Sequence, residues 1–99
     1  MPPKAPPFGR EAAEALALQA VAAIVADEDL VLRFLAVTGS TADDLGVRIR
    51  DPDFLGAVLD FVLEDDSSVR LVAEAAGIAP EMVLLARSKL PGGATDWTP

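Results

Sequence analysis

The side chains in this 99-residue chain that could carry out chemistry are almost all carboxylates. The sequence has 16 Asp and Glu residues against 8 Lys and Arg residues, and it contains no His, Cys or Tyr. These absences remove the usual ligands of structural zinc, haem and iron–sulfur clusters, and they leave no thiol nucleophile. No serine has a general base placed beside it by a motif, and no glycine-rich phosphate loop is present. We therefore expect no enzymatic activity, no catalytic residue and no cofactor.

One group of acids has part of the spacing of a metal site. Asp51, Asp53 and Gly56 match positions one, three and six of a calcium-binding loop. Positions five and twelve are then Leu55 and Val62, whose side chains cannot coordinate a cation. The remaining acids occur in short runs between apolar segments, where helix caps and solvated side chains are found. We therefore expect no metal site.

A near-continuous apolar run predicts a central helix at about residues 52–64. In its apolar part, residues 54–63, only Gly56 and Asp60 are not clearly apolar. Asp51 followed by proline is typical of a helix N-terminus. A helix that is apolar on nearly every side is buried among other helices. The predicted fold class is therefore all-α, a small compact bundle of five or six helices around this buried central helix.

Further helices are expected on both sides of the central one. Their limits follow from polar residues at the N-termini, glycine or proline beyond the C-termini, and apolar residues at helical spacing. Pro80 fits the first position of the last helix. These signals place the further helices at residues 10–26, 27–38, 41–50, 67–77 and 80–90.

Local signals also predict how individual helices begin and end. Gly39 is expected to end the second helix in the left-handed conformation, where glycine has no steric penalty. Thr41 with Asp44 resembles a capping box, with Asp in place of the usual Glu. Either Ser67 or Ser68 is expected to cap the helix that follows the central one.

The first and last helices carry more apolar residues than one face can hold. In the first, we expect Leu18, Val21 and Val25 to widen a buried face that includes Leu16. In the last, residues 82–86 are consecutively apolar. This helix is therefore expected to be either deeply buried or partly exposed with an adhesive surface.

The two ends of the chain lack the pattern of the helical domain, which we place at residues 10–91. Residues 1–9 contain four prolines and are expected to form a flexible leader. Such a segment can also bind an aromatic groove, but we favour a mobile chain end. Residues 92–99 are expected to form a flexible tail, which carries the only tryptophan, Trp97.

The last two helices, at about residues 67–90, also have the spacing of a DNA-binding helix-turn-helix. Ala73, Gly77 and Val83 occupy the positions of the small residue, the turn glycine and a packing residue. The second helix has few polar side chains for reading base edges, and the pair has no net positive charge. We favour an ordinary corner between two helices and retain a nucleic-acid-binding or transcription-regulatory protein as the alternative function.

The charge of the chain restricts its partners. A net charge of −8 repels nucleic acids and acidic membranes. The longest apolar stretch, residues 12–26, is shorter than the roughly 20 residues that span a bilayer, and it contains Glu14. The absence of cysteine agrees with a reducing compartment, so a cytoplasmic location is expected.

The leading functional hypothesis is a non-enzymatic interaction or adaptor protein that binds another protein. Arg87, Lys89 and Trp97 are its candidate partner contacts. Nucleic acids and membranes are not expected as partners, and the oligomeric state is left open between a monomer and a weak dimer.

Residues 33–45 and 70–83 have a similar order of residues, which raises the hypothesis of an internal repeat.

Four stretches together resemble a bacterial family of small helical proteins, found mainly in alphaproteobacteria and catalogued as domain of unknown function 3572. The resemblance covers roughly residues 10–93 and is most specific in the central block. It implies a compact helical cytoplasmic protein, and it brings no activity, cofactor or site residue with it. The four stretches are REAAEALALQA at 10–20, RFLAVTG at 33–39, DPDFLGAVLDFVLEDD at 51–66 and LPGG at 90–93.

Overall fold

The computed structural model describes residues 9–92 of the chain, which form six α-helices and no strand. The predicted all-α fold class is confirmed, and of the predicted five or six helices the structure has six in residues 9–92. The helices are α1 (Arg10–Val25), α2 (Glu28–Thr38), α3 (Ala42–Arg48), α4 (Pro52–Leu63), α5 (Asp66–Ala76) and α6 (Glu81–Ser88).

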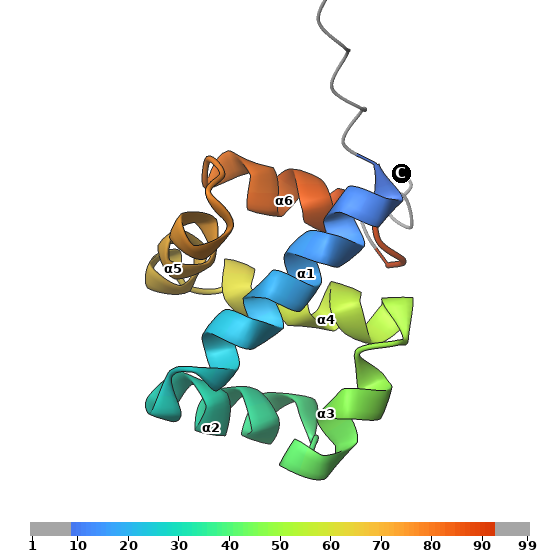
Figure 1. The fold of residues 1–99 in the computed structure, drawn as a ribbon, viewed down its shortest axis with the longest axis vertical. Coiled ribbons are helices and arrows are strands. Elements are labelled where there is room, and N and C mark those ends of the chain that lie inside the picture. Colours follow the sequence, from blue (N-terminus) through green and yellow to red (C-terminus); the bar gives the residue numbers. More distant parts are fainter. Residues whose placement is uncertain (1–8, 93–99) are drawn as a thin grey trace, which may run out of the picture.

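Two helices, α1 and α4, cross at the centre of the molecule. In Figure 1, α1 runs diagonally in front of α4, with α5 and α6 on one side of the crossing and α2 and α3 on the other. Helix α1 contacts α2, α4, α5 and α6, and α4 contacts α5 and α6. Helices α2, α5 and α6 therefore pack directly against one or both of the crossed pair.

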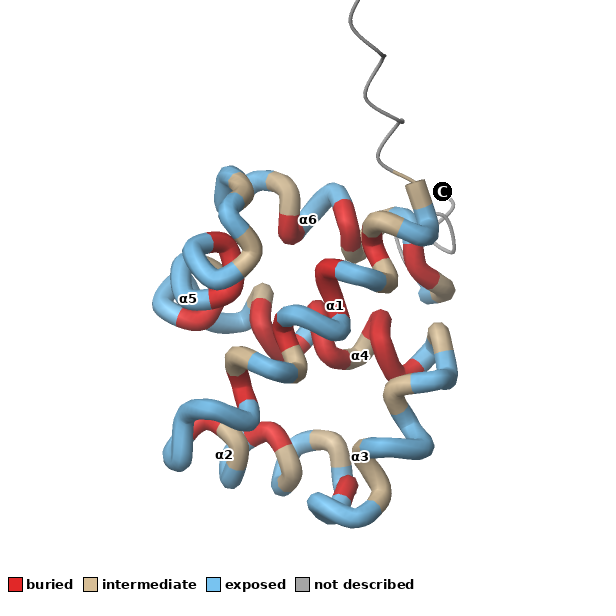
Figure 2. The backbone as a smooth tube through the Cα atoms, viewed as in Figure 1, coloured by how far each residue is buried: buried red, intermediate tan, exposed pale blue. Residues whose placement is uncertain are grey.

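Helix α4 is the most deeply buried element, as the apolar run predicts. Val58, Leu59 and Val62 are fully buried, while Asp60 is exposed. Figure 2 shows the buried positions gathered where α1 and α4 cross. Burial on several sides follows from the near-absence of polar residues in this helix. Its buried residues are Phe54, Leu55, Gly56, Val58, Leu59, Phe61 and Val62.

Helix α1 packs closely against α4 through small side chains. Ala13, Ala17 and Ala20 have no exposed area, so the helix backbone lies close to its neighbours. The prediction that Leu18 and Val25 widen this face is wrong, because they are 42% and 50% exposed on the opposite side of the helix. An alanine-rich helix has little difference between its faces in sequence, so its apolar spacing does not identify the buried one.

Three phenylalanines connect α2 to the central helix. The ring of Phe34 on α2 lies edge-on to Phe54 and Phe61, with centroid distances of 6.0 and 5.2 Å. The guanidinium groups of Arg48 and Arg33 lie over the outer rings, 5.7 Å from Phe54 and 5.6 Å from Phe61. Edge-to-face rings and overlying cations are both favourable arrangements. This row also ties α3, which buries no side chain of its own, to α4 through Arg48.

The predicted caps are largely present. Thr41 and Asp44 form a capping box, each side chain accepting from the other's backbone N–H at 3.2 Å. Asp51 Oδ1 accepts from the backbone N–H at position 53 at 2.9 Å and so caps α4. Gly39 and Gly77 end α2 and α5 with φ angles of 69° and 71°. The order of helix, left-handed glycine and helix therefore occurs twice in the fold.

The start of α5 and the limits of α6 differ from their predictions. The N-cap of α5 is Asp65 rather than a serine, because the extended backbone that precedes the helix ends there. Ser68 lies inside the helix, is buried, and donates from Oγ to Asp65 Oδ2 at 3.2 Å. Helix α6 begins one residue after Pro80, which is its N-cap, and it ends at Ser88 rather than at about residue 90.

Candidate functional site

The candidate contact residue Arg87 is turned into the domain. Its side chain is only 13% exposed. Its Nε donates to Asp60 Oδ1 at 2.6 Å, and its Nη2 donates to Asp60 Oδ2 at 3.1 Å. The other N–H groups reach main-chain carbonyl oxygens, at 2.9 Å for Pro91, 3.2 Å for Gly92 and 3.5 Å for Leu90. All five donors of the guanidinium therefore bind groups of this chain.

A glycine in α4 makes room for this guanidinium. A Cβ atom at Gly56 would lie 2.9 Å from Arg87 Nη1 and 3.0 Å from the carbonyl oxygen of Pro91. We call the arrangement of Arg87, Asp60, Gly56 and the carbonyls of residues 90–92 the Arg87 clasp. It accounts for both residues that interrupt the apolar run of the central helix. The sequence signal was the spacing of Gly56 and Asp60, which puts both on one face of a helix.

The other two candidate contacts are placed differently. Lys89 is exposed just beyond the end of α6. Trp97 lies outside the described residues. With Arg87 inside the clasp, the outward side of α6 presents Leu84 and Leu85, which are 64% and 39% exposed. No observation on residues 9–92 supports the nucleic-acid alternative. In a helix-turn-helix formed by α5 and α6, helix α6 would enter the DNA groove, and its outer face is apolar rather than basic.

The acidic residues do not form a compact cluster. Among residues 9–92, no three acidic side chains lie close enough together to hold a metal ion. Asp51, from the calcium-loop pattern, uses a carboxylate oxygen as a helix cap. None of the six described helices combines the length and apolar character that crossing a bilayer requires.

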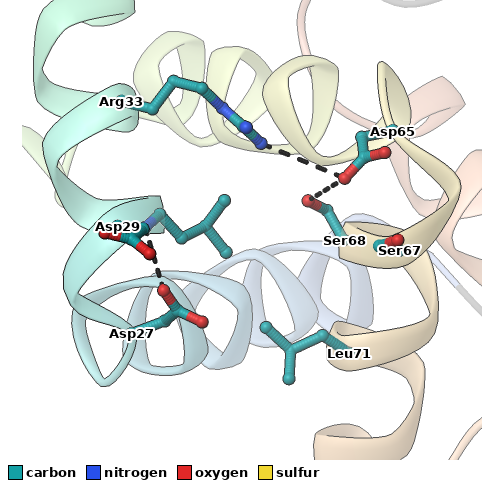
Figure 3. A pocket seen from close by; sticks show the side chains of 8 residues that line it. Asp27, Asp29, Arg33, Asp65, Ser67, Ser68 and Leu71 are labelled. Carbon is teal, nitrogen blue, oxygen red and sulfur yellow. Dashed lines mark hydrogen bonds and ion pairs between the residues drawn. The ribbon is translucent and has the colours of Figure 1, made fainter.

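The surface is hollowed between α2 and α5. A hollow of about 340 Å³ there, which we call the α2–α5 groove, is lined by residues of both helices. Figure 3 shows it, with Asp27, Asp29 and Arg33 on the α2 side facing residues of α5. A second hollow, of about 320 Å³, lies on the outer side of α5 and shares Ser67 and Leu71 with the groove. The residues that line the groove are Asp27, Asp29, Leu30, Arg33, Asp65, Ser67, Ser68 and Leu71.

Helix N-termini supply most of the polar atoms of the groove. Asp27 caps α2, where its Oδ1 accepts from the backbone N–H of Leu30 at 2.9 Å. Asp65 Oδ2 accepts from Ser68 and lies 3.9 Å from Arg33 Nη2. The two carboxylates therefore lie on opposite sides of the depression.

The α5 wall of the groove includes an apolar side chain that is open to solvent. Leu71 is 38% exposed, and it belongs to a row with Ser67, Arg70 and Glu74 along the outer side of α5. Residues at this spacing lie on one face of a helix. The sequence interpretation missed this site because a single leucine on a polar face carries no periodic signal. The facing wall comes from α2, about 40 residues earlier in the chain.

Comparison with family models matches residues 10–93 to the family described as protein of unknown function (DUF3572). The chain belongs to this family. The match takes in all six helices, so the family unit is the whole bundle. Searches among curated proteins and among solved structures found no match.

The family description assigns no activity. In this chain the central block and the LPGG segment, which are far apart in sequence, meet at the Arg87 clasp. The clasp therefore joins the turn after α6 to the central helix.

Proposed function

We propose that this protein is a non-enzymatic interaction or adaptor protein that binds a segment of another protein along the α2–α5 groove. The observation that carries the proposal is the exposed Leu71 in the wall of a hollow that is otherwise lined mostly by polar residues. An apolar centre surrounded by polar residues is the usual anatomy of a protein interface. Hollows of about 300 Å³ and more are of the size that holds ligand side chains.

Composition supports a binding role over catalysis. The chain has no His, Cys or Tyr, which are common general acids, bases or nucleophiles. The hydroxyl of Ser68 is buried and donates to Asp65, and the chain contains no histidine that could act as its base. The proposal places the interaction in the cytoplasm, in keeping with a chain free of cysteine.

Affinity capture with a matched pair of variants tests the proposal. Leu71→Ser removes the exposed apolar side chain of the groove, and Leu84→Ser removes a leucine of α6 that is more exposed, at 64% against 38%. A partner captured by the wild-type protein and by Leu84→Ser, but lost with Leu71→Ser in quantitative mass spectrometry, is the expected result. If every captured protein is retained by Leu71→Ser, or is lost equally with both variants, the groove is not the binding site.

A further inference from the structure

We propose that the α2–α5 groove accepts a cationic segment of the partner, in which an Arg or Lys side chain is adjacent to an apolar one. This inference rests on the proposed function and adds the chemical class of the partner. The apolar side chain would contact Leu71, and the cation would lie in the groove between the α2 wall, which carries Asp29, and the opposite wall, which carries Asp65.

The groove has an excess of negative charge. Asp27, Asp29 and Asp65 line it against the single cation of Arg33. Asp27 uses one oxygen to cap the backbone N–H of Leu30. Within the described chain, the side chain of Asp29 makes no hydrogen bond or ion pair. Its carboxylate is therefore available to a cation from outside.

The neighbouring hollow on the outer side of α5 has no excess charge. It is lined by Arg70 and Glu74, whose charges cancel, together with the shared residues Ser67 and Leu71. A cation is therefore attracted to the groove rather than to this hollow.

The geometry favours a side-chain cation over other positively charged ligands. A bound divalent metal ion needs several oxygen ligands converging on one point, and no three acidic side chains converge among residues 9–92. A guanidinium or ammonium group on a flexible stem needs only one or two carboxylates, and its stem packs against apolar surface. The exposed Leu71 offers such a surface beside the carboxylates.

Arg33 would compete with the incoming cation. Its Nη2 lies 3.9 Å from Asp65 Oδ2, and both side chains are about half exposed, at 57% and 48%. Such an exposed pair is weak and easily displaced. The guanidinium also lies over the ring of Phe61, where it can remain when the carboxylate is taken by a ligand. Removal of the Arg33 charge should therefore strengthen binding of a cationic segment.

Titration of the isotope-labelled full chain with short peptides, followed by amide chemical shifts, tests the inference. The probe is a blocked five-residue peptide of alternating leucine and arginine, and the same peptide with glutamate in place of arginine is its control. The variants are Asp29→Asn and Arg33→Gln. Asp43→Asn removes the same charge from an exposed position on α3, outside the groove.

The arginine peptide should shift the amides of Asp29, Leu30 and Leu71 in a saturable manner, and the glutamate peptide should not. Asp29→Asn should weaken binding about two- to five-fold, the effect of one partly exposed ion pair. Arg33→Gln should strengthen binding by a similar factor, and Asp43→Asn should have no effect. Equal weakening by Asp29→Asn and Asp43→Asn would show general charge attraction and would overturn the inference, as would equal binding of the glutamate peptide.

The natural partner separates a failure of this inference from a failure of the proposed function. A partner that depends on Leu71 but binds Asp29→Asn and Arg33→Gln as well as the wild type would contradict a cationic segment and leave the groove as the binding site. If no captured partner depends on Leu71, both the cationic segment and the proposed function are contradicted.

Discussion

Arg87 on α6 and Asp60 on α4 form a two-point ion pair, with Nε–Oδ1 and Nη2–Oδ2 distances of 2.6 and 3.1 Å. The same guanidinium binds three carbonyl oxygens of the turn that follows α6. A residue that the sequence suggests as a partner contact therefore has its hydrogen-bonding capacity used within the fold. The pair joins the end of the helical unit to its most buried helix.

Loss of the Arg87 side chain should destabilise the domain. Arg87→Ala leaves the carbonyls of residues 90–92 and the carboxylate of Asp60 without their donor, so the free energy of unfolding should fall by about 1–3 kcal/mol. Arg70→Ala, at an exposed position of α5, should change it by less than about 0.5 kcal/mol. Urea denaturation measures both. Equal midpoints for the two variants would show that the clasp contributes no stability.

A pair of glycine substitutions tests the close approach in the clasp. Alanine is normally better than glycine inside a helix, by about 1 kcal/mol. Gly46→Ala in α3 should show this gain, because a Cβ atom there meets nothing within 4 Å. Gly56→Ala should instead lower stability by about 1–3 kcal/mol, since its Cβ would collide with Arg87 and with a backbone carbonyl. A gain in thermal denaturation midpoint for both variants would contradict this geometry.

Truncation of the central helix should be costly. Leu59 has no exposed area, and Leu59→Ala should reduce the free energy of unfolding by about 2–5 kcal/mol through lost burial and a cavity. Total stability for a domain of this size is about 5–15 kcal/mol. Leu84→Ala, where the leucine is 64% exposed, is the matched control and should cost less than about 0.5 kcal/mol. A Leu59→Ala midpoint within error of the wild type would mean that α4 does not organise the core.

Helix α3 should be the least protected helix in native-state hydrogen exchange. It has seven residues and no fully buried side chain, and of its residues only Leu45 packs, partly buried, against the core, so less apolar contact opposes its local opening than in the other helices. The amides of α4 should exchange only through global unfolding. Protection in α3 equal to that in α4 would show that the Arg48–Phe54 contact holds it more firmly than its burial indicates.

Local signals in the sequence predict more of this fold than of its site. The apolar run of α4, the capping box at Thr41 and the helix-ending Gly39 depend on neighbouring residues, and all three are confirmed. The outward position of Leu18 was not predictable from spacing, because alanines surround it on α1. The partner of Arg87 lies 27 residues earlier in the chain, so only the packing of α6 against α4 reveals it.

The groove illustrates the same limit for function. Its two walls come from the starts of α2 and α5, and the acids there read in the sequence as helix caps, which Asp27 confirms. That these acids line one hollow together with Leu71 becomes visible only when both helices pack against α1. Composition alone predicts an acidic interaction protein and does not indicate where it binds.

Cross-linking from inside the groove is the most direct test of the central claim that a protein segment binds there. Because the chain has no cysteine, Ser67→Cys can be labelled at that position alone with a benzophenone photo-cross-linker. Asp43→Cys on α3 is the control. The account predicts a partner adduct from position 67 but not from position 43, with the linked peptide carrying Arg or Lys within about three residues of an apolar side chain. No adduct from position 67, or the same adducts from both positions, would contradict it.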